Sequence, residues 1–414
     1  MKKNLLLSLL CFAVVSFCPL RGDDPFSVVV TSATLPKLTV NYSSFPDLLN
    51  DVLNARGSFA PYANTDFSAN LTFLGISQAI MANSNPSGTA VQLQIPGINF
   101  SRTFSGSTRS NVENQIQDFF VKDGSAVVGD FLSYVARQSA VAVTDGNPSS
   151  STALMANDSF VSNGFTPANE VTFETVTGAT TTTQTQSNLS GLGIGFNSGS
   201  FTANGIKGTF NDFAIPFKIR FTDRVSLTGA VPFDLLDVDG AKIYGVGLNL
   251  ALPVRIAVMD KENPTNWRLT PLVGISGRGS KDLAGGGVIW MAGLNSCVDY
   301  RVSSKLIICM VNQVTVHEGI KIKYADYNFD PNVDQQMLKN GLRFVTPLSP
   351  RITGDLFVIE TNYLKDAAVK NFTTYGASLS YRLTPKTNIT LGGNYDTGSN
   401  YRSWSAGLSS AWKF

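Results

Sequence analysis

Histidine and cysteine, which often act as bases, nucleophiles or metal ligands, are scarce in this 414-residue sequence, with one His and four Cys. His317 is the sole histidine, and Glu318 beside it favours a solvated loop at the rim of the fold. A serine or phospholipase-type hydrolase would need a serine and an orienting residue close to that histidine, and the sequence pairs none with it. A zinc site would need three or four protein ligands. We therefore expect no catalytic residues, no metal and no cofactor.

Cys297 and Cys309 are the pair best placed for covalent chemistry. A hairpin turn centred on Ser303 would bring them directly opposite each other, six residues from the turn and on the same face. In an oxidising compartment such a pair forms a disulfide, which we expect here. A one-residue slip of register would set the two thiols diagonally apart and prevent the bond. Two small residues packed side by side are the alternative interpretation.

Basic side chains recur at strand positions opposite in parity to the large apolar residues. They are Lys218, Arg220, Arg255, Arg268, Arg343 and Arg382. The acidic residues with the same parity are fewer, namely Asp212, Asp299 and Asp396. If this face lines a pore, the excess of basic groups favours anions or carboxylate-bearing solutes. Internal ion pairs that fill a closed interior explain the same residues equally well.

The elements that must position these side chains begin after an export signal. Lys2 and Lys3 precede an apolar core at residues 4–18, and residues 19–22 provide a site for cleavage near Gly22. The net charge is +2, which gives no reason to expect nucleic acid as a partner. Charged residues make up 15% of the chain, against about 25% in soluble domains. Domain boundaries are therefore expected at 1–22 (signal peptide), 23–187 and 188–414.

The segment 23–187 has a mixed, partly helical pattern. Helices are expected within 46–56, 106–120 and 124–143, where apolar residues recur at helical spacing and Ser107 or Thr108 precedes the second. Residues 90–104 alternate as a strand does. Residues 178–191 are rich in Thr, Gln and Ser and are expected to form a linker. This segment would act as a plug of the following domain or lie in the periplasm.

From residue 188 to the end, apolar residues recur at every second position. The stretch 242–258 shows this most clearly, with a large apolar side chain at every even position from Tyr244 to Val258. The predicted strands are roughly 9 to 17 residues long, whereas soluble strands average about 5 or 6. Length, one apolar face and aromatic residues near strand ends are typical of a transmembrane β-barrel. Pro216 and Pro253 predict bulges or kinks.

Twelve antiparallel transmembrane strands fit this segment, and fourteen or sixteen stay possible if the N-terminal segment contributes. Counting back from the carboxyl end, short connections at 384–386, 349–350, 302–304 and 222–223 alternate with longer ones at 363–371, 317–337, 279–285 and 234–240. Outer-membrane barrels use short periplasmic turns and longer outer loops. The carboxyl-terminal strand would then end in the periplasm. The fold class is an all-β membrane barrel preceded by a partly helical segment.

The last strand carries the most specific feature of the chain. Trp404, Leu408, Trp412 and Phe414 lie at alternate positions, with small or polar residues between them. This strand resembles the carboxyl-terminal assembly signal of bacterial outer-membrane β-barrel proteins, a resemblance of class that covers the signal peptide and residues 188–414. It implies residence in the cell outer membrane, contact with its lipid and insertion by the barrel-assembly machinery.

Three functions are compatible with such a barrel. A porin-like or solute-specific channel with an N-terminal plug is the leading hypothesis, because the inner face is polar and rich in glycine. An adhesin or structural barrel that uses the loop 317–337 is the second. An autotransporter-like translocator is the third, although the N-terminal segment lacks the β-helix repeats usual for passengers. The sequence identifies neither a solute nor an oligomeric state.

Overall fold

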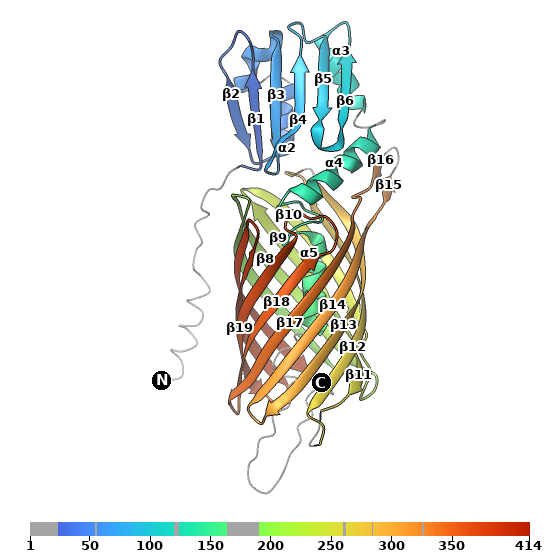
Figure 1. Cartoon of the computed structure of the whole chain (residues 1–414), viewed down its shortest axis with the longest axis vertical. Helices are drawn as coiled ribbons and strands as arrows, with labels where there is room; N and C mark the ends of the chain where they lie inside the picture. The colour runs from blue at the N-terminus through green and yellow to red at the C-terminus, as the bar shows by residue number, and fades with distance from the viewer. Residues whose placement is uncertain are drawn as a thin grey trace.

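The computed structural model describes residues 24–53, 56–119, 124–163, 190–259, 262–283, 285–324 and 327–414. The signal peptide expected at 1–22 lies outside these ranges, as do residues 178–189 of the expected linker. Two sheet-containing bodies stand end to end along the long axis of the molecule, with helices at and below their junction (Figure 1). The carboxyl terminus lies at the barrel end far from the first body.

The first body is the sheet domain, a six-stranded antiparallel sheet with strand order β2-β1-β3-β4-β5-β6. Its strands are β1 (Phe26–Thr31), β2 (Leu38–Tyr42), β3 (Phe67–Phe73), β4 (Ile76–Ser84), β5 (Ala90–Ile95) and β6 (Phe100–Ser105). Its helices are α2 (Phe45–Leu53) and α3 (Arg109–Asp118), with 3-10 turns η1 (Gly57–Asn64) and η2 (Pro96–Ile98). The expected strand 90–104 is therefore two strands, because the η2 turn at Pro96 interrupts it.

The helices expected in this segment are present with shifted ends. Thr108 caps α3, since its side-chain oxygen accepts a hydrogen bond from the backbone N–H of Asn111 at 3.3 Å. The next helix, α4 (Ser125–Gln138), stops five residues before the expected end at Val143. A further helix, α5 (Ser151–Asn163), was not predicted. It descends from the sheet-domain end into the barrel (Figure 1).

The second body is a closed antiparallel barrel. Its strands are β7 (Gly191–Ala203), β8 (Ile206–Arg220), β9 (Ser226–Val238), β10 (Ala241–Ala251), β11 (Val254–Ala257), β12 (Thr265–Ser280), β13 (Gly285–Ser303), β14 (Leu306–Ile320), β17 (Asp334–Ser349), β18 (Ile352–Tyr363), β19 (Asn371–Thr384), β20 (Thr387–Gly398) and β21 (Tyr401–Lys413). Because β11 continues β10 after a break at Leu252–Pro253, twelve strands surround the lumen, as predicted. β21 pairs with β7 and closes the barrel.

The connections at the sheet-domain end are shorter than expected. Asn204–Gly205 and Asp239–Gly240 form two-residue turns with positive φ at both positions, the backbone that hairpins with right-handed strand twist require. β9 runs to Val238, so the loop predicted at 234–240 is mostly strand. The loop predicted at 317–337 is largely strand as well, with a small hairpin of β15 (Ile322–Tyr324) and β16 (Tyr327–Phe329). Long strand ends therefore replace outer loops.

The outer surface of the barrel is apolar, as a lipid-facing wall requires. Leu248, Leu356 and Leu408 are among many large apolar side chains that stay exposed there. Three aromatic residues on neighbouring strands lie in direct register, Tyr375 beside Tyr395 beside Trp404, and all are exposed. Such a row is typical of the girdle at a membrane interface. The barrel is thus of the bacterial outer-membrane type, and this supports an outer-membrane location.

Among the described helices, none is both long and apolar enough to cross a membrane. The sheet domain and the barrel rim share one hydrophobic core. Phe26 and Phe73 of the sheet belong to the same cluster as Ile206, Leu236 and Ile243 at the barrel rim. The two bodies therefore pack against each other rather than being joined by a chain alone.

Candidate functional site in the barrel lumen

The helix α5 occupies the barrel lumen along one wall. It packs against β9, β10, β12 and β13, and also touches β14 and β17. The helix begins after Ser150, whose backbone carbonyl accepts from the N–H of Leu154 at 3.1 Å. Most of its residues are buried, polar ones included. The buried side that faces the wall mixes apolar residues with Ser151, Thr152 and Ser159, so the helix has no single apolar stripe and its sequence gave no clear helical period.

Three apolar contacts seat α5 at successive depths. Met155 packs with Leu272, Ile289 and Met291, while Ala153 and Ala156 pack with a cluster around Tyr363. Deeper in the lumen, the fully buried Phe160 contacts a cluster that contains Cys297, Val311 and Ile359. Burial of one large apolar side chain contributes about 1.5–3 kcal/mol. These contacts fix both the height and the rotation of the helix.

Polar groups of the barrel wall hold the same helix. The Gln313 side chain donates hydrogen bonds to the carbonyl of Ala156 at 2.9 Å and to the Ser159 hydroxyl at 3.0 Å. The Lys339 ammonium donates to the Asn157 side chain at 3.0 Å and lies 5.5 Å from the Phe160 ring centre. Lys339 is 1% exposed. A buried ammonium is costly unless paired or hydrogen-bonded, so these contacts depend on α5 being in place.

The segment 139–150 leads from α4 into α5 and closes the lumen at the sheet-domain end. We call it the lumen strap. Asn147 is fully buried, and its side-chain amide donates to the backbone carbonyl of Ala142 at 2.8 Å. The backbone carbonyl of Asn147 accepts a hydrogen bond from Tyr363 Oη at 2.6 Å. The buried Arg278 donates to the Ser149 carbonyl and forms an ion pair with Asp234 at 2.8 Å. The strap is therefore fixed to both sides of the barrel interior.

Asp145 in the lumen strap is a buried carboxyl group. Burial raises its pKa above the usual value, although hydrogen bonds from Thr152 at 2.7 Å and Gln335 at 3.3 Å act in the opposite direction. A carboxyl group with a raised pKa favours its neutral form. The strap is therefore expected to be held most tightly when Asp145 is protonated.

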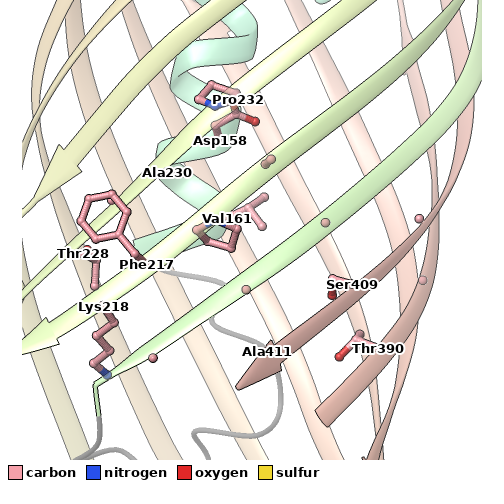
Figure 2. Close-up of a pocket in the computed structure, with 18 of the residues that line it drawn as sticks. Asp158, Val161, Phe217, Lys218, Thr228, Ala230, Pro232, Thr390, Ser409 and Ala411 are labelled. Atoms are coloured by element: carbon pink, nitrogen blue, oxygen red, sulfur yellow. The ribbon is translucent and has the colours of Figure 1, made fainter. Parts of the chain in front are cut away.

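A cavity of about 550 Å³ remains on the other side of α5. The helix contributes Leu154, Asn157, Asp158 and Val161 to it, a stripe at helical spacing. β7–β9 and the neighbouring β20 and β21 form the opposite wall, with Asp158 and Val161 of α5 across from Ser409 and Thr390 (Figure 2). Glycines are frequent in this wall. The small side chains of this wall leave the space that forms the cavity, whereas larger side chains fill the space between α5 and the wall against which it packs.

The predicted basic residues are largely at this cavity. Lys218, Arg220, Arg255, Arg268 and Arg343 line it, whereas Arg382 does not. Arg343 forms a buried ion pair with Asp355 at 3.1 Å, and Arg268 lies 3.6 Å from Asp299. Arg220 forms an ion pair with Asp223. Internal pairing thus accounts for three of the predicted residues, and it lowers the net positive field of the cavity.

The predicted disulfide between Cys297 and Cys309 is wrong. Both cysteines lie in the described part of the chain, and no disulfide joins them. The register places Cys297 opposite Val311 and Cys309 opposite Asp299, two residues out of line, because the turn between the strands lies at Ser304 and Lys305 rather than at Ser303. Such a diagonal offset separates the thiols beyond bonding reach. Both remain as buried thiols facing the lumen.

His317 is inside the barrel rather than in a solvated loop. It lies on β14, fully buried, with Nε2 2.9 Å from the Thr315 hydroxyl. Over the described residues, no group of three or more His, Cys, Asp or Glu side chains could hold a metal ion. His317 is therefore a packed polar side chain of the barrel interior.

The residues of the expected assembly signal point outward on the closing strand. Trp404, Leu408, Trp412 and Phe414 are 38, 54, 39 and 69% exposed. β21 is paired on both sides, with β20 and β7. Recognition of this strand by the barrel-assembly machinery stays a prediction.

Comparison with known proteins finds similar solved structures but no family. No family model and no curated protein matches the sequence. Solved structures to which this fold is similar include autotransporter domains, outer-membrane channels and porins. The beta domain of the Bordetella autotransporter BrkA is 13% identical, with a TM-score of 0.42 over 55% of this chain and 100% of that one. An outer membrane channel from Pseudomonas putida F1 is 14% identical, with a TM-score of 0.43 over 58% and 98%.

A third solved structure is the transport unit of the autotransporter AIDA-I from Escherichia coli. It is 11% identical, with a TM-score of 0.37 over 63% of this chain and 97% of that one. Translocators and channels are both among these neighbours, so their likeness does not separate the two functions. The distinction must come from the contents of the lumen and the position of the sheet domain.

Proposed function

We propose that this chain is an outer-membrane barrel that holds its own N-terminal sheet domain at the cell surface, with α5 and the lumen strap as the tether through the barrel. One observation carries the proposal. The sheet domain lies at the barrel end opposite the carboxyl terminus, and the chain returns from it through the lumen as α5 (Figure 1). This agrees with the translocator and adhesin alternatives drawn from the sequence more closely than with a periplasmic N-terminal segment.

The direction of the barrel in the membrane gives this arrangement its meaning. Bacterial outer-membrane barrels have an even number of strands, so both ends of the barrel sequence lie on one side of the membrane. In this chain β7 begins and β21 ends at the end away from the sheet domain. If that end is periplasmic, as the resemblance of β21 to an assembly signal implies, the sheet domain is outside the cell.

The contacts at the junction favour a permanently held domain. The Ser139 hydroxyl donates to the Leu74 carbonyl at 2.8 Å, and the Phe45 N–H donates to the Asp282 carbonyl at 2.7 Å. Together with the shared hydrophobic core, these bonds join sheet, strap and rim. A domain intended for release would need fewer such contacts. We therefore propose presentation at the surface rather than secretion.

Cysteine labelling of intact cells tests the proposal. Ser87→Cys places an exposed thiol in the β4–β5 turn of the sheet domain, and Lys386→Cys places one in the turn between β19 and β20. A membrane-impermeant maleimide should label Ser87→Cys on intact cells and Lys386→Cys only after the outer membrane is permeabilised. The opposite pattern would refute surface display.

A solute channel is the second candidate, and the cavity favours it. A space of about 550 Å³ beside α5, bordered by Lys218, Arg220 and Arg255, is large enough for a small solute. Passage through the barrel would require α5 to shift, because the strap closes the other end. Planar-bilayer recordings should then show little conductance for the full chain and more for variants with a loosened α5. Equal, negligible conductance in all of them would remove this candidate.

A further inference from the structure

The outer face of the sheet domain is an ordered array of polar side chains. The strand register aligns them in rows that cross the sheet: Asn41, Ser27 and Thr72 in the first; Thr39, Val29, Asn70, Met81, Gln94 and Ser101 in the second; Thr31, Ser68, Asn83, Gln92 and Thr103 in the third. We call these fourteen residues the amide-hydroxyl face. The alternate residues of the same strands, such as Phe26, Val28 and Phe73, point into the core.

The amide-hydroxyl face has no charge. Twelve of its fourteen residues are Ser, Thr, Asn or Gln, and the other two are Val29 and Met81. Charged residues make up only 15% of the whole chain, so this face shares the low charge of the sequence. Arg102, the charged residue of the six strands, has the opposite parity, and its guanidinium lies over the Phe119 ring at 4.6 Å. The face is therefore polar and uniformly neutral.

Most hydrogen-bonding groups on this face are not used by the protein. Within the described residues, the side-chain bonds made there are from Gln92 to the Ser101 hydroxyl at 3.4 Å and from Thr31 to the Ser68 carbonyl at 3.3 Å. The side chains of Asn83 and Gln94 bond to no described residue, and Asn70 Oδ1 has no partner although the atom is buried. Each free amide offers two donors and an acceptor. The face thus has unused capacity of both kinds.

The geometry of the face suits an extended partner. Neighbouring strands lie about 4.8 Å apart, so a row that crosses six strands spans roughly 24 Å. Its edge residues Thr39, Ser101 and Thr103 are exposed, and the inner ones are half-buried by one another. The helices of the domain pack on the core side, where Val112 of α3 meets Leu93 and Phe104. A long molecule can therefore lie along a row without obstruction from the domain.

We propose that the amide-hydroxyl face binds a neutral polysaccharide. Sugar hydroxyls donate and accept hydrogen bonds, as the amides and hydroxyls of this face do. An anionic polymer would need basic residues, and a protein partner would be met by aromatic anchors and arginine, which are the side chains enriched at protein interfaces. The face has neither. It is also too polar to enter a membrane. This inference rests on the proposed surface display for its biological setting but not for its chemistry.

Binding by the purified full-length protein in detergent tests the inference. The probes are three neutral polymers (dextran, mannan and a soluble β-glucan) and one acidic polymer, polygalacturonate. The face variant carries Asn70→Asp, Asn83→Asp and Gln94→Glu, which preserve shape, remove amide donors and add charge. We expect at least one neutral polymer to bind, and the face variant to weaken that binding about tenfold or more. Polygalacturonate should not bind the wild type.

The control places two changes of the same kinds on another surface. Asn114→Asp and Gln117→Glu are exposed positions on α3, so this variant should bind as the wild type does. Ser101→Lys at the exposed edge strand provides a second face variant that is tolerant in folding, and it should also weaken binding. Retained heat-modifiable migration on gels confirms a folded barrel in each variant, and circular dichroism checks the sheet domain.

Three results would overturn the inference. One is that no neutral polymer binds. Another is equal binding by the wild type and both face variants. The third is a dimer in sedimentation experiments that the face variants dissolve, because the occupant would then be a second copy of the chain. Failure of the labelling test at Ser87 on intact cells would refute surface display alone and leave binding by the purified protein unaffected.

Discussion

Replacement of Phe160 by alanine should release α5 from the barrel wall. The Phe160 side chain is fully buried and contacts the cluster that contains Cys297, with the Lys339 ammonium 5.5 Å from its ring centre. Phe→Ala changes at buried sites cost about 3–5 kcal/mol. Since water can enter the vacated space from the adjoining cavity, we expect the lower end, about 3 kcal/mol. At 1.36 kcal/mol per factor of ten, the undocked population of α5 should rise roughly a hundredfold.

The thiol of Cys297 reports that population directly. It is 0% exposed while α5 is docked, so a small methanethiosulfonate reagent should modify it only when the helix moves away. The rate is measured by mass spectrometry on the peptide that contains Cys297, in a Cys309→Ala background. Phe160→Ala should raise it by about two orders of magnitude at fixed reagent concentration.

Val161 provides the matched control on the same helix. Its side chain faces the cavity and is 45% exposed, so Val161→Ala should change the rate by less than about threefold, as surface changes usually do. Equal rates for Phe160→Ala and Val161→Ala would refute the reasoning, because α5 would then not be held by its wall-facing side.

Three further predictions concern the strap and the assembly signal. Arg278→Met leaves Asp234 buried without its ion-pair partner and should cost about 3–5 kcal/mol, seen as a lower transition temperature in heat-modifiability gels and partly restored by adding Asp234→Asn. Burial raises the pKa of Asp145. The contribution of the protonated Asp145 to stability is complete below the pKa of the unfolded state and is lost as pH rises through the pKa of the folded state. Asp145→Asn should therefore gain stability relative to the wild type as pH increases from 4 to 8. Deletion of Phe414 should lower the amount of folded barrel in outer-membrane fractions at equal synthesis.

The barrel was predictable because lipid imposes a simple rule on sequence. Each strand must present apolar side chains to the membrane at every second position, and that period is visible from Tyr244 to Val258 without any tertiary information. The strand count followed from the same rule, and the break at Pro253 from the missing N–H of proline. The parity rule also placed five of six predicted basic residues at the lumen cavity.

Register was not predictable to the precision that a disulfide needs. The turn lies at Ser304 and Lys305, later than the predicted centre at Ser303, and this places Cys309 beside Asp299 instead of Cys297; the alternating pattern does not show the exact turn position. The same limit hid His317, whose neighbours resemble a loop although the strand continues through them. Local irregularities of backbone decide both outcomes.

The sequence by itself determined the membrane barrel, its closing strand and the polar interior, because those features arise from the side-chain period of single strands. Tertiary structure alone decided that α5 fills the lumen and that the sheet domain lies at the end opposite the carboxyl terminus. The physical reason is that the wall-facing side of α5 mixes polar and apolar residues, so its own sequence has no amphipathic period to reveal it. The residues that recognise it, Gln313 and Lys339, lie more than 150 positions away along the chain.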